Sequence, residues 1–220
     1  MLQNYKAIIY DWDGTLSNSE DWVVEAHNQV RKAFDLPLWM REDIFSSSSL
    51  STRELYPQIY GENSDKAMQI LFDFTTKNNL SSADPYDGAE DLLKYVQSQN
   101  IPQAVVSNKR HEPLNEVIEY LNWQGYFETA IGAGFCDRDK PAPAPLLKCL
   151  ELMQGGLTPQ DILYVGDTET DLACAKNAGC DVAFIQSDRQ RPDLIEKYSP
   201  IIACDTILEL AKLLKGQRAA

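Results

Sequence analysis

The sequence predicts an α/β fold, in which a doubly wound, Rossmann-like parallel sheet carries an inserted all-helical segment. Short apolar runs alternate with stretches of helical periodicity along most of the 220 residues. Within these runs apolar residues are not interleaved with polar ones, which is typical of parallel strands covered on both faces. One stretch, residues 18–83, contains helical patterns and no convincing strand.

Six apolar runs predict the strands of the sheet. They lie at residues 5–10, 101–106, 129–131, 162–165, 182–185 and 200–203. Between and after the later runs, apolar residues recur with a spacing of three and four, which predicts helices. These helical patterns lie at residues 89–99, 114–121, 144–153, 172–178 and 207–214.

The stretch that follows the first predicted strand reads as an all-helical insert. Helical patterns cover residues 20–34, 52–59 and 64–78. The insert ends at Ser81-Ser82-Ala83-Asp84-Pro85, which has the composition of a linker. We therefore expect a discontinuous core, residues 1–17 and 84–220, and a helical insert, residues 18–83.

Composition and charge exclude several classes of protein. The 44% apolar and 24% charged residues are normal for a soluble globular chain, and no apolar run approaches the roughly 20 residues that span a bilayer. A net charge of −13 would repel nucleic acids and anionic membranes. The five cysteines show no Cys-x-x-Cys spacing, and the N-terminus lacks the pattern of a signal peptide. We expect a cytoplasmic monomer or homodimer without disulfides and without a zinc site.

Polar residues at the carboxyl ends of the predicted strands point to one site. Ligands of open parallel sheets bind just beyond these ends. Carboxylates without histidine or cysteine suit a hard cation, above all Mg2+. The cation and a lysine would offset the repulsion between the carboxylates and leave room for a phosphate dianion. The side chains at the strand ends are Asp11, Asp13, Ser107, Asn108, Asp167 and Asp171, and Lys140 comes from the segment before the strand at 162–165.

Four motifs resemble those of the haloacid dehalogenase superfamily, in the same order along the chain. They are Asp11-x-Asp13-Gly14-Thr15-Leu16, Ser107-Asn108-Lys109, Lys140-Pro141-x-Pro143 and Gly166-Asp167-x-x-x-Asp171. The helical insert resembles the cap of that superfamily. The segment Pro85-Tyr86-Asp87-Gly88-Ala89 is similar to the point where the chain re-enters the core in phosphoglycolate-phosphatase-like hydrolases.

The resemblance implies a role for each residue of these motifs. Asp11 would be the nucleophile that forms an aspartyl-phosphate, and Asp13 the general acid and base. Lys140 would pair with Asp11 and with the phosphate. Ser107 and the Asn108 amide would hold phosphate oxygens. The metal would be bound by Asp11, Asp167 and the carbonyl of Asp13, with Asp171 acting through water.

The expected function is therefore Mg2+-dependent hydrolysis of a small-molecule phosphate monoester, with phosphoglycolate as one candidate. Phosphoryl transfer within a sugar phosphate, as in a mutase, is a second hypothesis. A catalytically silent binding protein on the same fold is a third, since a fold alone does not fix function. The presence of Asp11, Asp13, Lys140 and Asp167 argues against the silent protein, and Asp13 disfavours a dehalogenase.

Each motif alone also has a purely structural interpretation. Asp-x-Asp-Gly is found in turns and calcium-like loops, and Ser107-Asn108 could cap the next helix. Asp167 and Asp171 could be charges at a helix N-terminus, and Lys140 could be an exposed loop lysine. Lys109 could act in the site or lie on a solvated surface.

Substrate selection is expected in the insert. Ser49, Thr52 and Arg53 begin a predicted helix there and are expected to influence which leaving groups are accepted. Arg53 could contact a second anionic group of the substrate. It could instead pair with Glu54 or Asp43 on a solvated face.

Overall fold

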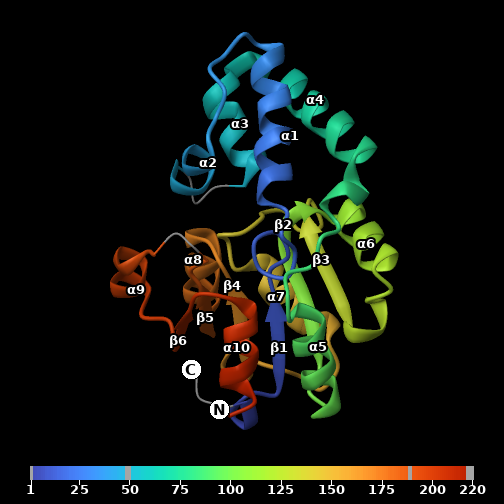
Figure 1. Ribbon diagram of the computed structural model, residues 1–220, viewed down its shortest axis with the longest axis vertical. Helices are drawn as coiled ribbons and strands as arrows, with labels where there is room; N and C mark the ends of the chain where they lie inside the picture. The colour runs from blue at the N-terminus through green and yellow to red at the C-terminus, as the bar shows by residue number, and fades with distance from the viewer. Residues whose placement is uncertain (1, 48–50, 188–189, 217–220) are drawn as a thin grey trace.

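The computed structural model describes residues 2–47, 51–187 and 190–216, and a six-stranded parallel sheet forms its centre (Figure 1). The strand order is β3-β2-β1-β4-β5-β6, so the chain winds outward in both directions from β1 and reverses between β1 and β4. The predicted doubly wound fold is confirmed. The strands are β1 (Ala7–Tyr10), β2 (Gln103–Arg110), β3 (Thr129–Ala133), β4 (Ile162–Gly166), β5 (Asp181–Ile185) and β6 (Ile202–Cys204).

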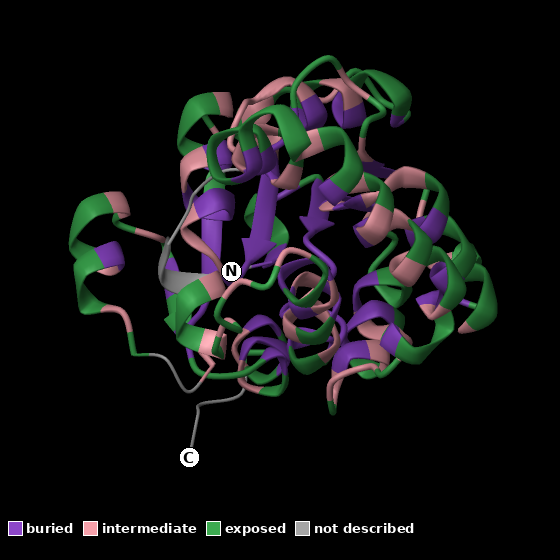
Figure 2. Ribbon diagram, turned by 90° about the horizontal axis from the view of Figure 1, so that it is seen from above, coloured by how far each residue is buried: buried purple, intermediate pink, exposed green. Residues whose placement is uncertain are grey.

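Helices cover both faces of this sheet. Side chains of β1 alternate between two apolar clusters, with Ile8 in one and Ile9 in the other, because successive strand residues point to opposite faces. The first cluster includes α5 (Ala89–Ser98), α6 (His111–Tyr120) and α10 (Ile207–Leu214). The second includes α7 (Ala144–Leu152), α8 (Glu169–Ala178) and α9 (Pro192–Tyr198). Figure 2 shows the buried strands lying inside the layers of helices.

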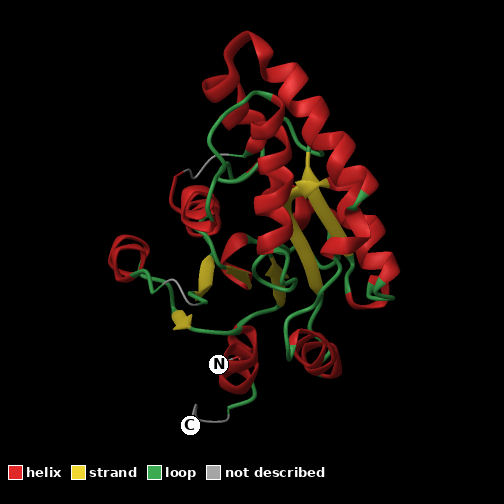
Figure 3. Ribbon diagram, turned by 45° about the horizontal axis from the view of Figure 1, so that its top comes forward, coloured by secondary structure: helices red, strands yellow, loops and turns green. Residues whose placement is uncertain are grey.

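Four helices lie together beyond the carboxyl ends of the strands (Figures 1 and 3). They are α1 (Glu20–Ala33), α2 (Arg41–Ser47), α3 (Thr52–Tyr60) and α4 (Ser64–Lys77). Three of them share an apolar cluster that is separate from those of the sheet and includes Val30, Tyr56 and Leu71. Residues 18–83 contain no strand where they are described, but the exact domain boundaries at 17/18 and 83/84 stay a prediction.

The two connections between these helices and the sheet run side by side. The Ser17 hydroxyl donates a 2.7 Å hydrogen bond to the carbonyl of Ser82, and the Asn18 amide donates one of the same length to the carbonyl of Asp84. No helix among the described residues is long and apolar enough to cross a membrane.

The structure corrects several predicted elements. Strand β2 begins two residues later than expected and continues to Arg110, past the motif at 107–109. Its pairing with β3 shifts register between Val106 and Arg110, which is a bulge. The sequence interpretation missed α2 and α9, because each has only seven residues and too few apolar positions to show helical periodicity.

Candidate active site

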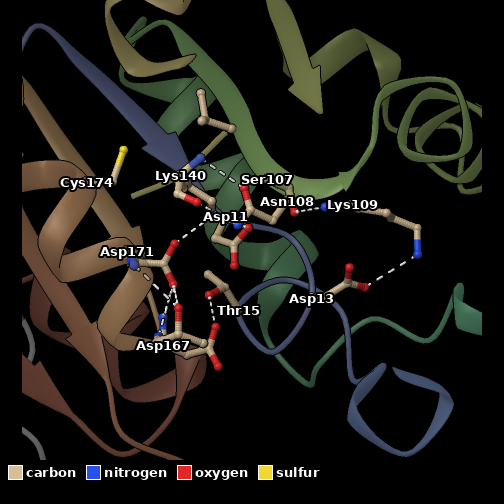
Figure 4. A network of polar contacts seen from close by, with 12 residues as sticks. Asp11, Asp13, Thr15, Ser107, Asn108, Lys109, Lys140, Asp167, Asp171 and Cys174 are labelled. Carbon is tan, nitrogen blue, oxygen red and sulfur yellow. Dashed lines mark hydrogen bonds and ion pairs between the residues drawn. The ribbon is translucent and has the colours of Figure 1, made fainter. Parts of the chain in front are cut away.

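A buried network at the ends of β1 and β4 unites three of the predicted site residues. The Nζ of Lys140 lies 2.8 Å from Oδ1 of Asp11 and 2.6 Å from Oδ1 of Asp171 (Figure 4). All three residues are almost inaccessible to solvent. The interpretation of Lys140 as an exposed loop lysine is therefore wrong. Tyr164 of β4 completes the network, with its hydroxyl 2.9 Å from both Lys140 Nζ and Asp171 Oδ1.

Three carboxylates come together at the same place. One oxygen from each of Asp11, Asp167 and Asp171 can be chosen so that all lie within 4.8 Å of one another. Asp167 accepts a 2.9 Å hydrogen bond from the Thr15 hydroxyl. Gly14 stands beside Asp167 with φ +85°, and a Cβ there would collide with the Asp167 carboxylate. A glycine is thus needed where the chain turns away from β1.

Asp171 is held by protein donors on both of its oxygens. Its Oδ1 faces Lys140 and Tyr164, and its Oδ2 accepts hydrogen bonds from the Thr168 hydroxyl at 2.6 Å and the Thr168 amide at 3.0 Å. Thr168 and Asp171 form a capping box at the start of α8. Asp171 is therefore a charge at a helix N-terminus, as the structural interpretation has it. The same carboxylate also forms an ion pair with Lys140.

Burial and charge set the proton affinities in this network. Burial, and then the negative charge of Asp171, raise the pKa of Asp11 from 3.8 to about 7, although Lys140 works in the opposite direction. Burial alone would raise the pKa of Asp171, but Lys140 and the hydrogen bonds from Lys140 and Thr168 outweigh it and lower the pKa. Burial alone would lower the pKa of Lys140, but the two aspartates raise it. One lysine thus faces two buried carboxylates, with a third nearby.

This donor set fits a hard divalent cation. The cluster offers carboxylate oxygens only, which is the chemistry that Mg2+ prefers. A cation beside Asp11 would also lower the pKa of this carboxyl, against the burial and the Asp171 charge that raise it. Asp11 and Asp167 are the residues that could bind the ion directly, since both oxygens of Asp171 are already engaged by the protein.

Asp13 lies apart from the carboxylate cluster. Its Oδ1 accepts a 2.6 Å hydrogen bond from Ser19 and lies 3.5 Å from Nζ of Lys109. Lys109 is 8% exposed, donates a 3.0 Å hydrogen bond to Ser82 Oγ and sits 4.3 Å from the centre of the Trp22 ring. A solvated surface position for Lys109 is therefore wrong. The expected metal contact through the Asp13 carbonyl stays a prediction.

Ser107 and Asn108 face the site from the bulged end of β2. The Asn108 side chain donates to the carbonyl of Lys140 at 3.0 Å and accepts from the Lys140 amide at 3.1 Å, which fixes the loop that carries the lysine. Ser107 is 4% exposed, and its hydroxyl accepts from the Lys109 amide at 3.2 Å. The helix-cap interpretation of Ser107-Asn108 is wrong, because Arg110 occupies the N-cap position of α6.

Arg53 reaches the site from the N-terminus of α3. Its guanidinium lies 3.5 Å from Asp139 Oδ1 and donates a 3.0 Å hydrogen bond to the carbonyl of Asp137. The neighbouring Glu54 pairs with Arg138 at 3.0 Å instead. Arg53 is therefore directed towards the core loop and does not simply pair with Glu54 on a solvated face. Ser49, which was expected to act beside it, lies outside the described residues.

These groups surround a cavity of about 340 Å³ between the strand ends and the helices above them. Asp11, Asp13, Ser107, Asn108, Lys140 and Arg53 all line it. The structure thus brings together every predicted catalytic and substrate-binding residue, whereas Asp167 and Asp171 are not among the residues that line the cavity. A volume of this size is typical of a small-molecule site.

Comparisons with known proteins identify the family of this chain. Residues 8–185 match the family described as haloacid dehalogenase-like hydrolase. The chain belongs to the haloacid dehalogenase-like hydrolase family. The resemblance seen in the four motifs is thereby confirmed.

Two curated relatives and one solved structure illustrate the match. A phosphoglycolate phosphatase from Aquifex aeolicus is 27% identical over 86% of this chain and 90% of its own length. The pyrophosphatase PpaX of Anoxybacillus flavithermus is 22% identical over 96% and 97%. A haloacid dehalogenase-like hydrolase family protein from Streptococcus pneumoniae superimposes with a TM-score of 0.81 at 20% identity, covering 98% of this chain and all of its own. The solved structure supports the fold alone. The family match and the two curated relatives confirm the predicted enzyme class, a haloacid dehalogenase-like phosphatase.

Sequence reasoning missed four polar residues of the site. Thr15 holds Asp167, Ser19 holds Asp13, Asp139 holds Arg53, and Tyr164 contacts Lys140 and Asp171. Thr15 and Asp139 stand inside or beside the quoted motifs, so their position was a usable signal. Tyr164 gave none, because a tyrosine within an apolar strand is most simply interpreted as part of the core.

Proposed function

We propose that this chain is a Mg2+-dependent phosphatase that hydrolyses a small-molecule phosphate monoester through an aspartyl-phosphate on Asp11. The observation that carries the proposal is the buried contact of Asp11 with Lys140 at the point where the strand order reverses. A carboxylate in this position is held in place by the lysine and has a cavity in front of it. Phosphoglycolate is one candidate substrate, because an enzyme of that name is among the relatives.

In the first half-reaction the Asp11 carboxylate attacks phosphorus and the bond to the leaving oxygen breaks. Asp13 gives that oxygen a proton, which makes the departing group a neutral alcohol. In the second half-reaction Asp13 takes a proton from water, the water oxygen attacks phosphorus, and Asp11 and inorganic phosphate are released. The hydrogen bond from Ser19 orients Asp13 for both proton transfers.

Other residues hold the phosphate and the charges. Ser107, the Asn108 amide and Lys140 would bind the phosphate oxygens. Arg53 would lie at the edge of the space that the leaving group occupies. Asp11, Asp167 and the Asp13 carbonyl would hold Mg2+, with Asp171 acting through water. When bound, the ion would offset negative charge on the phosphate during transfer.

The test is to trap the phosphorylated enzyme. Wild type is mixed with an ester under Mg2+, quenched in acid and digested, and mass spectrometry locates the added phosphate. The proposal expects it on Asp11, with inorganic phosphate released at a matching rate. Conversion of a sugar phosphate to its isomer without phosphate release would favour a mutase, and absence of turnover on a broad panel of esters would favour a silent protein. The cytoplasmic location and the monomeric or dimeric state stay predictions.

A further inference from the structure

The cavity wall that α1 and α4 form, across from the residues assigned to phosphate binding, is mainly apolar. Trp22 and Ala26 line it from α1, and Met68, Leu71 and Phe72 line it from α4. Positions 68, 71 and 72 are spaced by three and four, so they share one face of α4. Trp22, Met68 and Phe72 are only partly buried, although such side chains normally pack into a core. This face of α4 therefore turns part of its apolar surface towards the space in front of Asp11.

The basic side chains that line the cavity all have carboxylate partners among the described residues. Lys140 pairs with Asp11 and Asp171, Lys109 with Asp13, Arg53 with Asp139, and Arg110 with Glu112. Arg110 also stacks on the Phe72 ring, with its guanidinium carbon 4.1 Å from the ring centre. A second anionic group on the substrate would have to displace one of these pairs.

Polar groups on the same wall are few and uncharged at neutral pH. Burial, and then the charge of Arg31, lower the pKa of His27 to about 4, so its ring is neutral and hydrogen bonds to the Tyr56 hydroxyl at 2.9 Å. Thr75 lies one turn beyond Phe72 on α4 and adds a hydroxyl. Lys109 lies over the Trp22 ring and Arg110 over the Phe72 ring, but both cations already have carboxylate partners. A carboxylate or a second phosphate placed against this wall would lose hydration and would have to compete with Asp13 or Glu112 for these cations.

We propose that the leaving group of the substrate is an uncharged, apolar alcohol, which packs against Trp22, Met68 and Phe72 while its phosphate faces Asp11. The inference rests on the proposed phosphatase function and names its substrate class. It favours such esters over phosphoglycolate, the candidate taken from a relative's name, and over pyrophosphate, because both of these have an anionic leaving group. The chemistry at phosphorus is unchanged, since Asp13 protonates the leaving oxygen of an alkyl phosphate in the same way.

The experiment uses a series of phosphate esters that differ only in apolar surface. Ethyl, butyl and hexyl phosphate have leaving groups of nearly equal acidity, so their kcat/KM values report packing and not bond strength. With Mg2+ present we expect kcat/KM to rise about fourfold for each methylene that is buried. Hexyl phosphate should exceed phosphoglycolate by at least about tenfold, since a charged group fares worse on this wall.

The outcomes distinguish this inference from the proposed function. A flat alkyl series, or a preference for phosphoglycolate, overturns the apolar leaving group and leaves the phosphatase intact. Failure to release phosphate from every ester in the presence of Mg2+ overturns the proposed function itself.

A pair of variants on α4 localises the effect. Phe72→Ala should lower kcat/KM for hexyl phosphate about tenfold and leave ethyl phosphate within about twofold of wild type. Ile70→Ala is the matched control, because Ile70 packs against the apolar cluster of the helices and does not line the cavity. It should change both esters by one common factor. If Phe72→Ala also lowers both esters equally, the wall does not contact the leaving group. The alkyl series on wild type decides the matter if either variant fails to fold.

Discussion

Replacing Asp11 by asparagine should abolish turnover and, in metal-free buffer, make the protein more stable. Asparagine has nearly the same shape but cannot attack phosphorus. Asp11 is 5% exposed and shares Lys140 with Asp171, so one buried lysine faces two carboxylates. Removing one of these carboxylates leaves a simple pair between Lys140 and Asp171. Active sites commonly carry such destabilising arrangements for the sake of function.

The size and pH dependence of this effect follow from the pKa. The folded-state pKa of Asp11 is raised from 3.8 to about 7, so the ionised carboxylate opposes folding. The penalty is absent well below the unfolded pKa, grows between pH 3.8 and 7, and is complete above pH 7. At 1.36 kcal/mol for each pKa unit the complete penalty is about 4 kcal/mol, and at pH 5 it is about 2 kcal/mol.

The assay is urea unfolding in EDTA at pH 5 and pH 8, followed by circular dichroism. Asp11→Asn should unfold with a free energy about 2–4 kcal/mol above wild type, and the difference should grow by about 2–3 kcal/mol between the two pH values. Asp13→Asn is the matched control, because the Asp13 side chain is 21% exposed and lies outside the carboxylate cluster. It should lose activity without the pH-dependent gain. An Asp11→Asn protein that is no more stable than wild type at pH 8 would refute the electrostatic argument, and one that keeps a tenth of wild-type activity would refute the covalent mechanism.

Four further outcomes are expected. Lys140→Met should abolish activity and lower the free energy of unfolding by about 3–5 kcal/mol in denaturant melts, because it strands two buried carboxylates. Lys109→Met should lower kcat about 10- to 100-fold with little change in KM, and Lys109→Arg should restore part of it, because the cation positions Asp13. Arg53→Ala should change the ranking of esters by kcat/KM; one common factor for all of them would place the selection of the leaving group elsewhere. EDTA should stop phosphate release and added Mg2+ should restore it.

The positions of the strand-end residues could be predicted because the fold itself brings them together. Once the apolar runs were interpreted as parallel strands, the carboxyl ends of β1 and β4 had to meet at one edge, which places Asp11 near Asp167. Which residues surround them was harder to predict. Lys109 follows Asn108 on an exposed-looking segment, yet the bulge in β2 turns it towards Asp13 and Ser82. Pairing irregularities depend on the neighbouring strand, so a local pattern does not contain them.

Two further features could not be predicted from the sequence: the short helices, and which side of each helix faces the site. The apolar pattern of α4 predicts a helix that packs by one face, and part of that face indeed joins the cluster with Val30 and Tyr56. The same periodicity does not reveal that Phe72 borders a cavity, because periodicity gives a direction around the helix and not what lies there.

Lys109 links Asp13, the proposed general acid and base, to the segment that connects the helical insert to the core. Its ammonium contacts Asp13, which follows β1, and the hydroxyl of Ser82, which precedes the re-entry into the core. The Ser82 carbonyl in turn accepts the hydrogen bond from Ser17, four residues beyond Asp13. Displacing the 79–84 segment would therefore break contacts of Lys109 and alter the surroundings of Asp13 at the same time.

The contacts that Lys140 makes with Asp11 and Asp171 lie within the core and do not involve this segment. Substitution of Ser82 by alanine should consequently impair the proton transfers assigned to Asp13 while leaving the Asp11 network intact. This would be seen as a lower kcat with an unchanged pH dependence of the free energy of urea unfolding, although that free energy itself should fall because the buried hydrogen bonds of Ser82 are lost. A normal kcat would show that Asp13 does not need this link.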